Sequence, residues 1–198
     1  MVSDNDNSSG TSLGMLEGLR ANEEVAWQRL VELYSPLIDL WCRRFQLQQA
    51  DTADIRQEVF LAVRRKIGDF HRESATDSFR GWLRTITRNK INDLGRRRRS
   101  QPEGTGVGDQ LEQTAAQVAQ EDGDDTTAEG RILYRRALAL IQQDFEDCTW
   151  RAFWGVVIDG RSATAVALDL GVSVNVVYLA KSRVLKRLRE EFTVLLDH

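Results

Sequence analysis

Apolar residues recur every three or four positions through two long stretches of this chain, which is the spacing of helices that bury one face. The first stretch runs from residue 13 to about residue 98 and is interrupted by a polar loop over residues 69–78. Its apolar positions fall into three sets: Val25, Ala26, Leu30, Leu33, Leu37, Leu40 and Trp41, then Ile55, Val59, Phe60, Val63 and Ile67, then Phe79, Trp82, Leu83, Ile86, Ile91 and Leu94. We predict three helices, the first bent at Pro36 and the second capped by Asp51 or Thr52.

The second stretch predicts four helices, near residues 131–145, 148–158, 162–170 and 174–194. The last two have the pattern of a helix-turn-helix. Ala167 is small enough for a close helix crossing, Gly171 can take the positive φ of a tight turn, and Ser173 can cap the following helix. The inward positions of that helix are Val177, Ala180, Val184 and Leu188.

Polar segments separate these stretches. We expect residues 1–12 to be disordered and residues 101–130 to form a flexible linker in which residues 111–120 are transiently helical. The fold class is therefore all-α. Two small helical domains, at 13–100 and 131–198, are joined by a flexible acidic linker.

Charge is strongly segregated along the chain, although the net charge is only −3. Residues 80–99 contain eight cations and one anion, whereas residues 101–130 contain eight anions and no Lys or Arg. Local fields, rather than the sum, attract a polyanion. The basic segment is thus a candidate nucleic-acid surface, and the acidic linker could mask it in a closed free form.

The outward face of the last helix carries side chains suited to the major groove, with polar groups for base edges and cations for phosphates. They are Asn175, Tyr178, Lys181, Ser182, Arg183 and Arg187. The alternative is an ordinary helical hairpin with a solvated basic face. For the helix at 79–98, the alternative to strand binding is a core helix whose cations face water.

The order of these features resembles that of an extracytoplasmic-function sigma factor, a two-domain class of the sigma-70 family. The segment Asp54-Ile-Arg-Gln-Glu-Val-Phe resembles the part that binds core polymerase. The segment Phe79-Arg-Gly-Trp-Leu-Arg-Thr-Ile-Thr-Arg-Asn-Lys, with the arginines after it, resembles the −10-element helix. The C-terminal helix-turn-helix resembles the −35-reading domain.

The resemblance implies bacterial core RNA polymerase and promoter DNA as partners, together with an anti-sigma factor that the sequence does not identify. It places core binding on Asp54, Gln57 and Glu58, with capture of a flipped −10 base in the loop 70–78. The residues assigned to the −10 element are His71, Arg72, Ser74, Arg80, Arg84, Arg88, Asn89, Arg96, Arg97, Arg98 and Arg99. The linker either threads through the polymerase as a nucleic-acid mimic or is a plain tether.

The recognition helix departs from the family pattern, because the family often has an arginine where this chain has Ala180. The promoter sequence therefore cannot be copied from relatives. The first helix of the helix-turn-helix also differs, reading Ala165-Val-Ala where the family usually has Glu-Ile-Ala.

Other classes of function find little support in the sequence. No nucleophile–base pair, metal cluster or phosphate loop is present, so neither an enzyme nor a cofactor or metal is expected. Cys42 and Cys148 are expected to be buried free thiols in a reducing cytoplasm. No membrane insertion is expected. The remaining rival is a stand-alone dimeric helix-turn-helix regulator, which leaves the basic helix at 79–98 unexplained.

Overall fold

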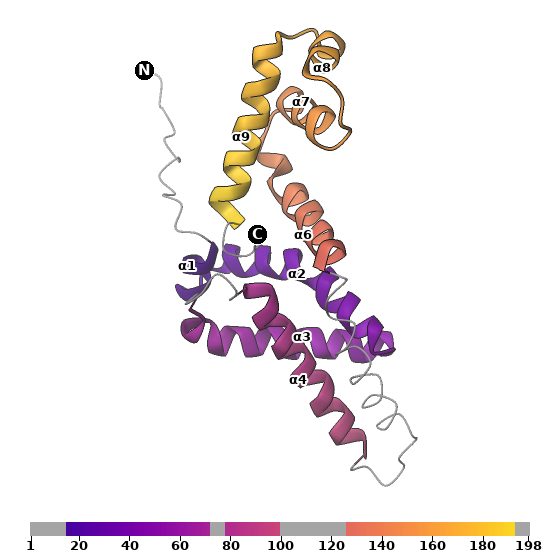
Figure 1. Cartoon of the computed structure of the whole chain (residues 1–198). Helices are drawn as coiled ribbons and strands as arrows, with labels where there is room; N and C mark the ends of the chain where they lie inside the picture. The colour runs from indigo at the N-terminus through magenta and orange to yellow at the C-terminus, as the bar shows by residue number, and fades with distance from the viewer. Residues whose placement is uncertain (1–14, 72–77, 100–125, 193–198) are drawn as a thin grey trace. The chain divides into compact units, whose positions relative to one another are not determined.

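The computed structural model describes residues 15–71, 78–99 and 126–192 (Figure 1). Over these ranges the chain forms helices and turns with no strand, which confirms the all-α fold. The described residues divide into two compact units, residues 16–135 and residues 136–192. The expectations for residues 1–12, most of the linker and the transient helix at 111–120 lie outside the described residues.

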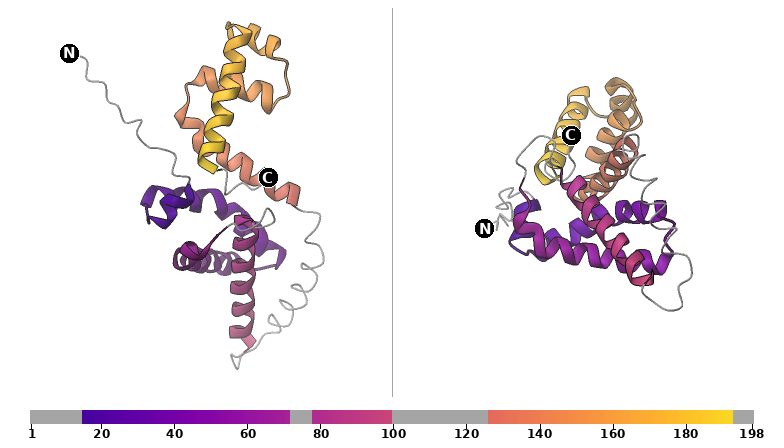
Figure 2. Two further views of the ribbon diagram at one scale, coloured as in Figure 1. Left: turned by 60° about the vertical axis from the view of Figure 1, so that its left-hand side comes forward. Right: turned by 60° about the horizontal axis from the view of Figure 1, so that its bottom comes forward.

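The larger unit is built mainly from three long helices, α2 (Glu24–Arg44), α3 (Gln49–Lys66) and α4 (Phe79–Arg99). The short α1 (Met15–Arg20) precedes them, and a turn of 3-10 helix, η1 (Ile67–Asp69), follows α3. Helix α4 packs on both α2 and α3, and Figure 2 shows the crossing from two further sides. The three predicted helices are thus confirmed, with Pro36 inside the continuous α2.

The buried face of α2 is wider than the apolar pattern suggested. Tyr34, Ile38 and Cys42 are fully buried together with the expected leucines. Val25, which the pattern placed in the core, is 61% exposed. At about 100° per residue it lies roughly opposite the centre of the buried face, so that prediction was wrong.

The start of α3 also differs from expectation. The helix begins at Gln49 with Gln48 as its N-cap, so neither Asp51 nor Thr52 caps it. Asp51 lies within the first turn, where its carboxylate accepts a hydrogen bond from Arg98 of α4. The Asp51 side chain therefore forms an ion pair between α3 and α4 instead of the helix cap that the local sequence predicted.

Aromatic side chains hold together the two chain ends on either side of residues 72–77. The ring of Phe79 lies 5.3 Å from those of Tyr34 and Phe70, and the ring of Trp82 lies 5.0 Å from that of Phe70. Arg20 donates a hydrogen bond of 2.5 Å to the Phe70 carbonyl. The entrance and exit of the polar loop are therefore anchored in the core.

Helix α6 (Thr126–Ile141) crosses the boundary between the two units and begins five residues before the expected start near residue 131. The smaller unit continues with η2 (Gln142–Asp144), α7 (Asp147–Val157), α8 (Ala163–Leu170) and α9 (Val174–Phe192). Its core cluster is formed by Ala152, Val166, Ala167, Val177 and Ala180.

The two cysteines have different environments. Cys42 is buried in α2, as expected, and burial followed by the nearby Asp39 carboxylate raises its pKa to about 12. Cys148 is exposed in the first turn of α7, so the expectation of a buried thiol was wrong there. Cys148 lies outside the buried face of α7, which is formed by Trp150, Ala152, Phe153 and Gly155.

Across the described helices, none is long and apolar enough by itself to cross a bilayer. Taken together, α8 and α9 reach the required length and apolar composition, but the pair is bent by 106°.

Candidate nucleic-acid interface

The α8–turn–α9 segment has the geometry of a helix-turn-helix. Ser162 caps α8 by accepting a hydrogen bond from the Ala165 amide at 3.2 Å. Gly171 ends α8 with φ of 67°, and the Oγ of Ser173 accepts a hydrogen bond from the Val176 amide at 3.4 Å. The two helices bend by 106° at this turn, within the 90–120° typical of the motif.

Small residues allow the helices of this unit to approach closely. Ala167 is 4% exposed and packs in the same cluster as Val177 and Ala180. A Cβ added to Gly155 of α7 would lie 3.0 Å from Cγ2 of Val166. The inward set predicted for α9 is buried in full, and Phe192 extends it by one turn.

The outward face of α9 presents most of the residues predicted to read DNA. Four of them are exposed, namely Asn175, Tyr178, Ser182 and Arg183, and Lys181 is half-buried. Val176 and Leu179 are exposed on the same helix, at 42% and 47%. The start of the helix therefore offers apolar as well as polar contacts to a partner.

Arg187 differs from the rest of this set. Its Nε donates to Asp144 of η2 at 2.9 Å, and its Nη1 lies 2.5 Å from Glu191. Partial desolvation opposes the charged guanidinium, but the two carboxylates outweigh it and raise the pKa of Arg187. The Arg187 side chain thus forms ion pairs within the smaller unit, in addition to any contact with DNA.

On α4, three arginines repeat at intervals of four and so share one side of the helix. We call Arg80, Arg84 and Arg88 the arginine stripe. Asn89 beside it is exposed. The hydroxyls of Thr85 and Thr87 donate hydrogen bonds to backbone carbonyls one turn earlier on α4. These hydroxyl protons are therefore not directed toward a partner outside the helix.

The basic end of α4 is tied to α3 by ion pairs. Lys90 and Arg97 lie 3.3 and 3.1 Å from the two carboxylate oxygens of Glu58, and Arg98 pairs with Asp51. Arg96 lies 3.7 Å from Asp93, three residues earlier on the same helix. The side chain of Arg99 lies outside the described residues. The sequence predicted that the run Arg96–Arg99 contacts phosphates. In the structure Arg97 and Arg98 of this run pair with carboxylates of α3.

The same contacts change the environment of Glu58. Partial burial is the largest single effect and acts to raise its pKa, but the hydrogen bonds and charges of Arg97 and Lys90 together outweigh it, and the pKa of Glu58 is lowered. Asp54 and Gln57, also assigned to core polymerase, are exposed on α3.

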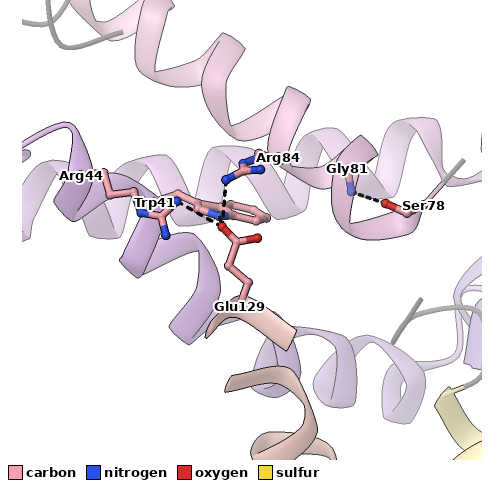
Figure 3. A network of polar contacts seen from close by, with 6 residues as sticks. All are labelled: Trp41, Arg44, Ser78, Gly81, Arg84 and Glu129. Carbon is pink, nitrogen blue, oxygen red and sulfur yellow. Dashed lines mark hydrogen bonds and ion pairs between the residues drawn. The ribbon is translucent and has the colours of Figure 1, made fainter. Parts of the chain in front are cut away.

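Only the borders of the −10 loop are described. His71 is exposed, with Nδ1 3.0 Å from the Asp69 carbonyl. Ser78 precedes α4, and its Oγ accepts a hydrogen bond from the Gly81 amide at 2.9 Å (Figure 3). Arg72 and Ser74 lie outside the described residues.

Sequence reasoning missed one polar cluster altogether. Glu129 of α6 is 1% exposed, and its Oε1 accepts hydrogen bonds from the Trp41 indole at 2.7 Å, from Arg84 at 2.9 Å and from Arg44 at 3.2 Å. Figure 3 shows the carboxylate of Glu129 reaching toward these three side chains of α2 and α4. The only signal in the sequence was that Glu129 is the last acid before an apolar pattern.

Metal binding finds no support in the described part of the chain, where no three His, Cys, Asp or Glu side chains gather around a common point. The chemistry offered by these surfaces is binding chemistry, with cations, amides and aromatic rings.

Comparison with protein families connects this geometry to a known domain. Residues 30–101 match the family model of Sigma-70 region 2, so the match covers α2 from Leu30 together with α3 and α4. The comparison with curated proteins gave no match. The chain therefore contains a sigma-70 region 2 domain, which supports a sigma factor of the sigma-70 family acting in transcription initiation.

Proposed function

We propose that this chain is an extracytoplasmic-function sigma factor that binds bacterial core RNA polymerase and directs initiation at specific promoters. The observation that carries the proposal is the region 2 match over residues 30–101, in one chain with the helix-turn-helix of α8 and α9. A region 2 domain meets the polymerase and the −10 element, and a second DNA-reading module selects the −35 element.

The exposed side of α3 is the proposed contact with the polymerase. The side chains of Asp54 and Gln57 are exposed on this side of α3. Glu58 is one-third exposed and also braces α3 against α4, so it combines a structural role with any contact to the polymerase.

The proposed −10 site combines the arginine stripe, Asn89 and the loop before α4. Unstacking a base costs a few kcal/mol, which stacking and hydrogen bonds in a pocket must offset. The aromatic cluster around Phe79 supports this role because it fixes both ends of the loop. Cations along α4 then hold the backbone of the opened strand.

The proposed −35 site is the start of α9. Asn175 and Tyr178 lie where base edges are read, and Lys181, Ser182 and Arg183 follow toward the phosphates. Because the strand that a sigma factor opens belongs to the chromosome, we place the protein in the cytoplasm. It carries out no chemical step of its own in this proposal, and an anti-sigma factor is a further partner to seek.

The test is a pull-down with bacterial core RNA polymerase, followed by run-off transcription from a library of promoter fragments. We expect binding to core and new, discrete start sites. Replacing Asp54 and Gln57 by Ala should weaken core binding at least tenfold, whereas Arg65→Ala, at an exposed position later on α3, should not.

Failure to bind core, together with tight binding of a protein dimer to a palindromic duplex, would replace this proposal with a stand-alone regulator. Binding to core without promoter-specific starts would limit the function to the region 2 domain.

A further inference from the structure

Glu129 sits in a site built to hold an anion. One carboxylate oxygen accepts three hydrogen bonds, two from guanidinium groups and one from an indole N–H. The guanidinium of Arg84 also lies over the Trp41 ring, 5.8 Å from its centroid. Guanidinium groups bind carboxylate and phosphate oxygens alike, because both present planar or tetrahedral oxygen pairs to the same donors.

The site belongs to the arginine stripe that the proposed function assigns to DNA. Arg84 is its central member. On one side of it, a Cβ at Gly130 of α6 would lie 3.8 Å from Nη1 of Arg80. On the other side, a cavity of about 100 Å³ is lined by Trp41, Arg44 and Arg84 and continues to Arg88. The first turn of α6 therefore covers part of a longer cationic surface.

Burial of Glu129 has an energetic consequence for this surface. A buried carboxylate is tolerated when cations and donors satisfy it, and removing the acid alone takes away an anion that two partly buried guanidinium groups contact. Exchange for another anion avoids this cost, because the arginines and the indole keep an acceptor. A phosphodiester, which also carries one negative charge, is a suitable replacement.

The geometry points to an exchangeable anion site at Trp41, Arg44 and Arg84, which holds the Glu129 carboxylate in the free protein and a backbone phosphate of single-stranded DNA in the bound protein. Glu129 is then an internal competitor that lowers the affinity of the free protein for nucleic acid. This inference rests on the proposed function, since it assumes that the arginine stripe of α4 meets the opened strand.

The experiment measures binding of the full chain to a fluorescent single-stranded oligonucleotide, without polymerase, across a range of salt concentrations. Glu129→Gln keeps the shape of the side chain and removes its charge. We expect the affinity to rise about tenfold, the equivalent of one hydrogen bond to a charged group. The slope of log K against log salt should stay that of the wild type, because the same phosphate occupies the site in both bound proteins.

Two controls separate competition from a general charge effect. Glu17→Gln makes the same change in net charge at an exposed position of α1 and should leave the affinity and slope unchanged. In an Arg84→Gln background, Glu129→Gln should give a smaller gain, because one of the two guanidinium partners of the phosphate is gone. An undiminished gain without Arg84, or an equal gain from Glu17→Gln, overturns the inference.

A second measurement uses the unaltered protein, in case the variants fold poorly. Hydrogen exchange of residues 127–135 should speed up when the oligonucleotide binds, because the phosphate displaces Glu129. Unchanged protection there, with DNA bound, overturns the inference. If exchange and affinity respond as expected but core polymerase does not bind, the anion site stands and the sigma-factor proposal fails. If core binding and promoter starts are found while Glu129→Gln has no effect, only the anion site fails.

Discussion

At the scale of single residues, the local pattern identified charged side chains but not their partners. Glu58 was assigned to the polymerase from its place in a motif, and its carboxylate holds Lys90 and Arg97 of the neighbouring helix. Asp51 was assigned to a cap and pairs with Arg98. Ion pairs between helices depend on the crossing of the helices, which no local pattern contains.

Glu58→Gln should therefore reduce the free energy of unfolding at neutral pH by about 0.5 kcal/mol, the size of a partly exposed ion pair. The folded pKa of Glu58 is lowered, so its stabilising effect is complete above the ordinary glutamate pKa and is lost as pH falls through the folded value. Urea unfolding of wild type and variant should differ at pH 7 and converge at acid pH, below the folded pKa of Glu58. Asp54→Asn, at an exposed position of the same helix, should show no such difference at either pH.

The two cysteines should differ sharply in reactivity. Cys148 is exposed, whereas burial raises the pKa of Cys42 to about 12, and only a thiolate attacks a disulfide reagent rapidly. We expect one thiol to react in the native protein at pH 8 and the second only after denaturation. Cys148→Ser should remove the fast phase, and Cys42→Ala should leave it intact. A fast phase that survives Cys148→Ser would show that α2 opens readily.

At the scale of elements, the apolar periodicity predicted where the helices lie, because one buried face imposes one spacing on the sequence. It was less accurate at helix ends, where caps and tertiary contacts compete. Helix α8 ends as expected, since Gly171 adopts a left-handed conformation that other residues rarely take. Helix α6 begins five residues early, since Glu129 is fixed by partners on α2 and α4.

Gly171→Ala should destabilise the smaller unit by about 1 kcal/mol, because a Cβ is strained at φ of 67°. Nothing lies within 4 Å of that Cβ, so the cost is conformational rather than a clash. Gly171→Asn should destabilise the unit by less than Gly171→Ala does, since asparagine tolerates the left-handed region of backbone conformation. Thermal unfolding of both variants tests the idea. An equal loss in the two would mean that the turn matters for another reason.

Two arginines of α9 should separate binding from stability. Arg183 is exposed, and its replacement by Ala should weaken binding to a −35 duplex several-fold without changing the melting temperature. Arg187 is held by Asp144 and Glu191, so Arg187→Ala should lower the melting temperature. The affinity for the −35 duplex and the melting temperature, by calorimetry, are to be measured on the same samples. Equal effects of both variants on affinity alone would place Arg187 on the DNA.

At the scale of the whole molecule, the boundary between the compact units lies inside α6 rather than before it. The larger unit extends to Arg135, so the first part of α6 belongs with the region 2 domain and the rest with the helix-turn-helix unit. Sequence reasoning set a domain start at residue 131, where composition changes from acidic to apolar. Composition marks the end of the linker but does not say which core the next turn joins.

Deletion of residues 136–198 should therefore leave a folded fragment that binds core polymerase as well as the full chain does and has lost selection of the −35 element. Circular dichroism checks the fold, and a pull-down with competition by the full chain checks the affinity. A folded fragment that no longer binds core would move the polymerase contact out of α3.

The sequence by itself determined the helical fold, the helix-turn-helix with its small and capping residues, and the separation of basic and acidic segments, because spacing, turn chemistry and charge are all local properties. It also contained the motifs from which region 2 was inferred. Only the tertiary structure decided which cations of α4 are engaged in packing, that Cys148 is exposed, and that Glu129 meets Trp41 and Arg84. The contacts of Glu129 with Trp41 and Arg84 join residues 45 or more positions apart, and burial of such pairs depends on how the helices cross.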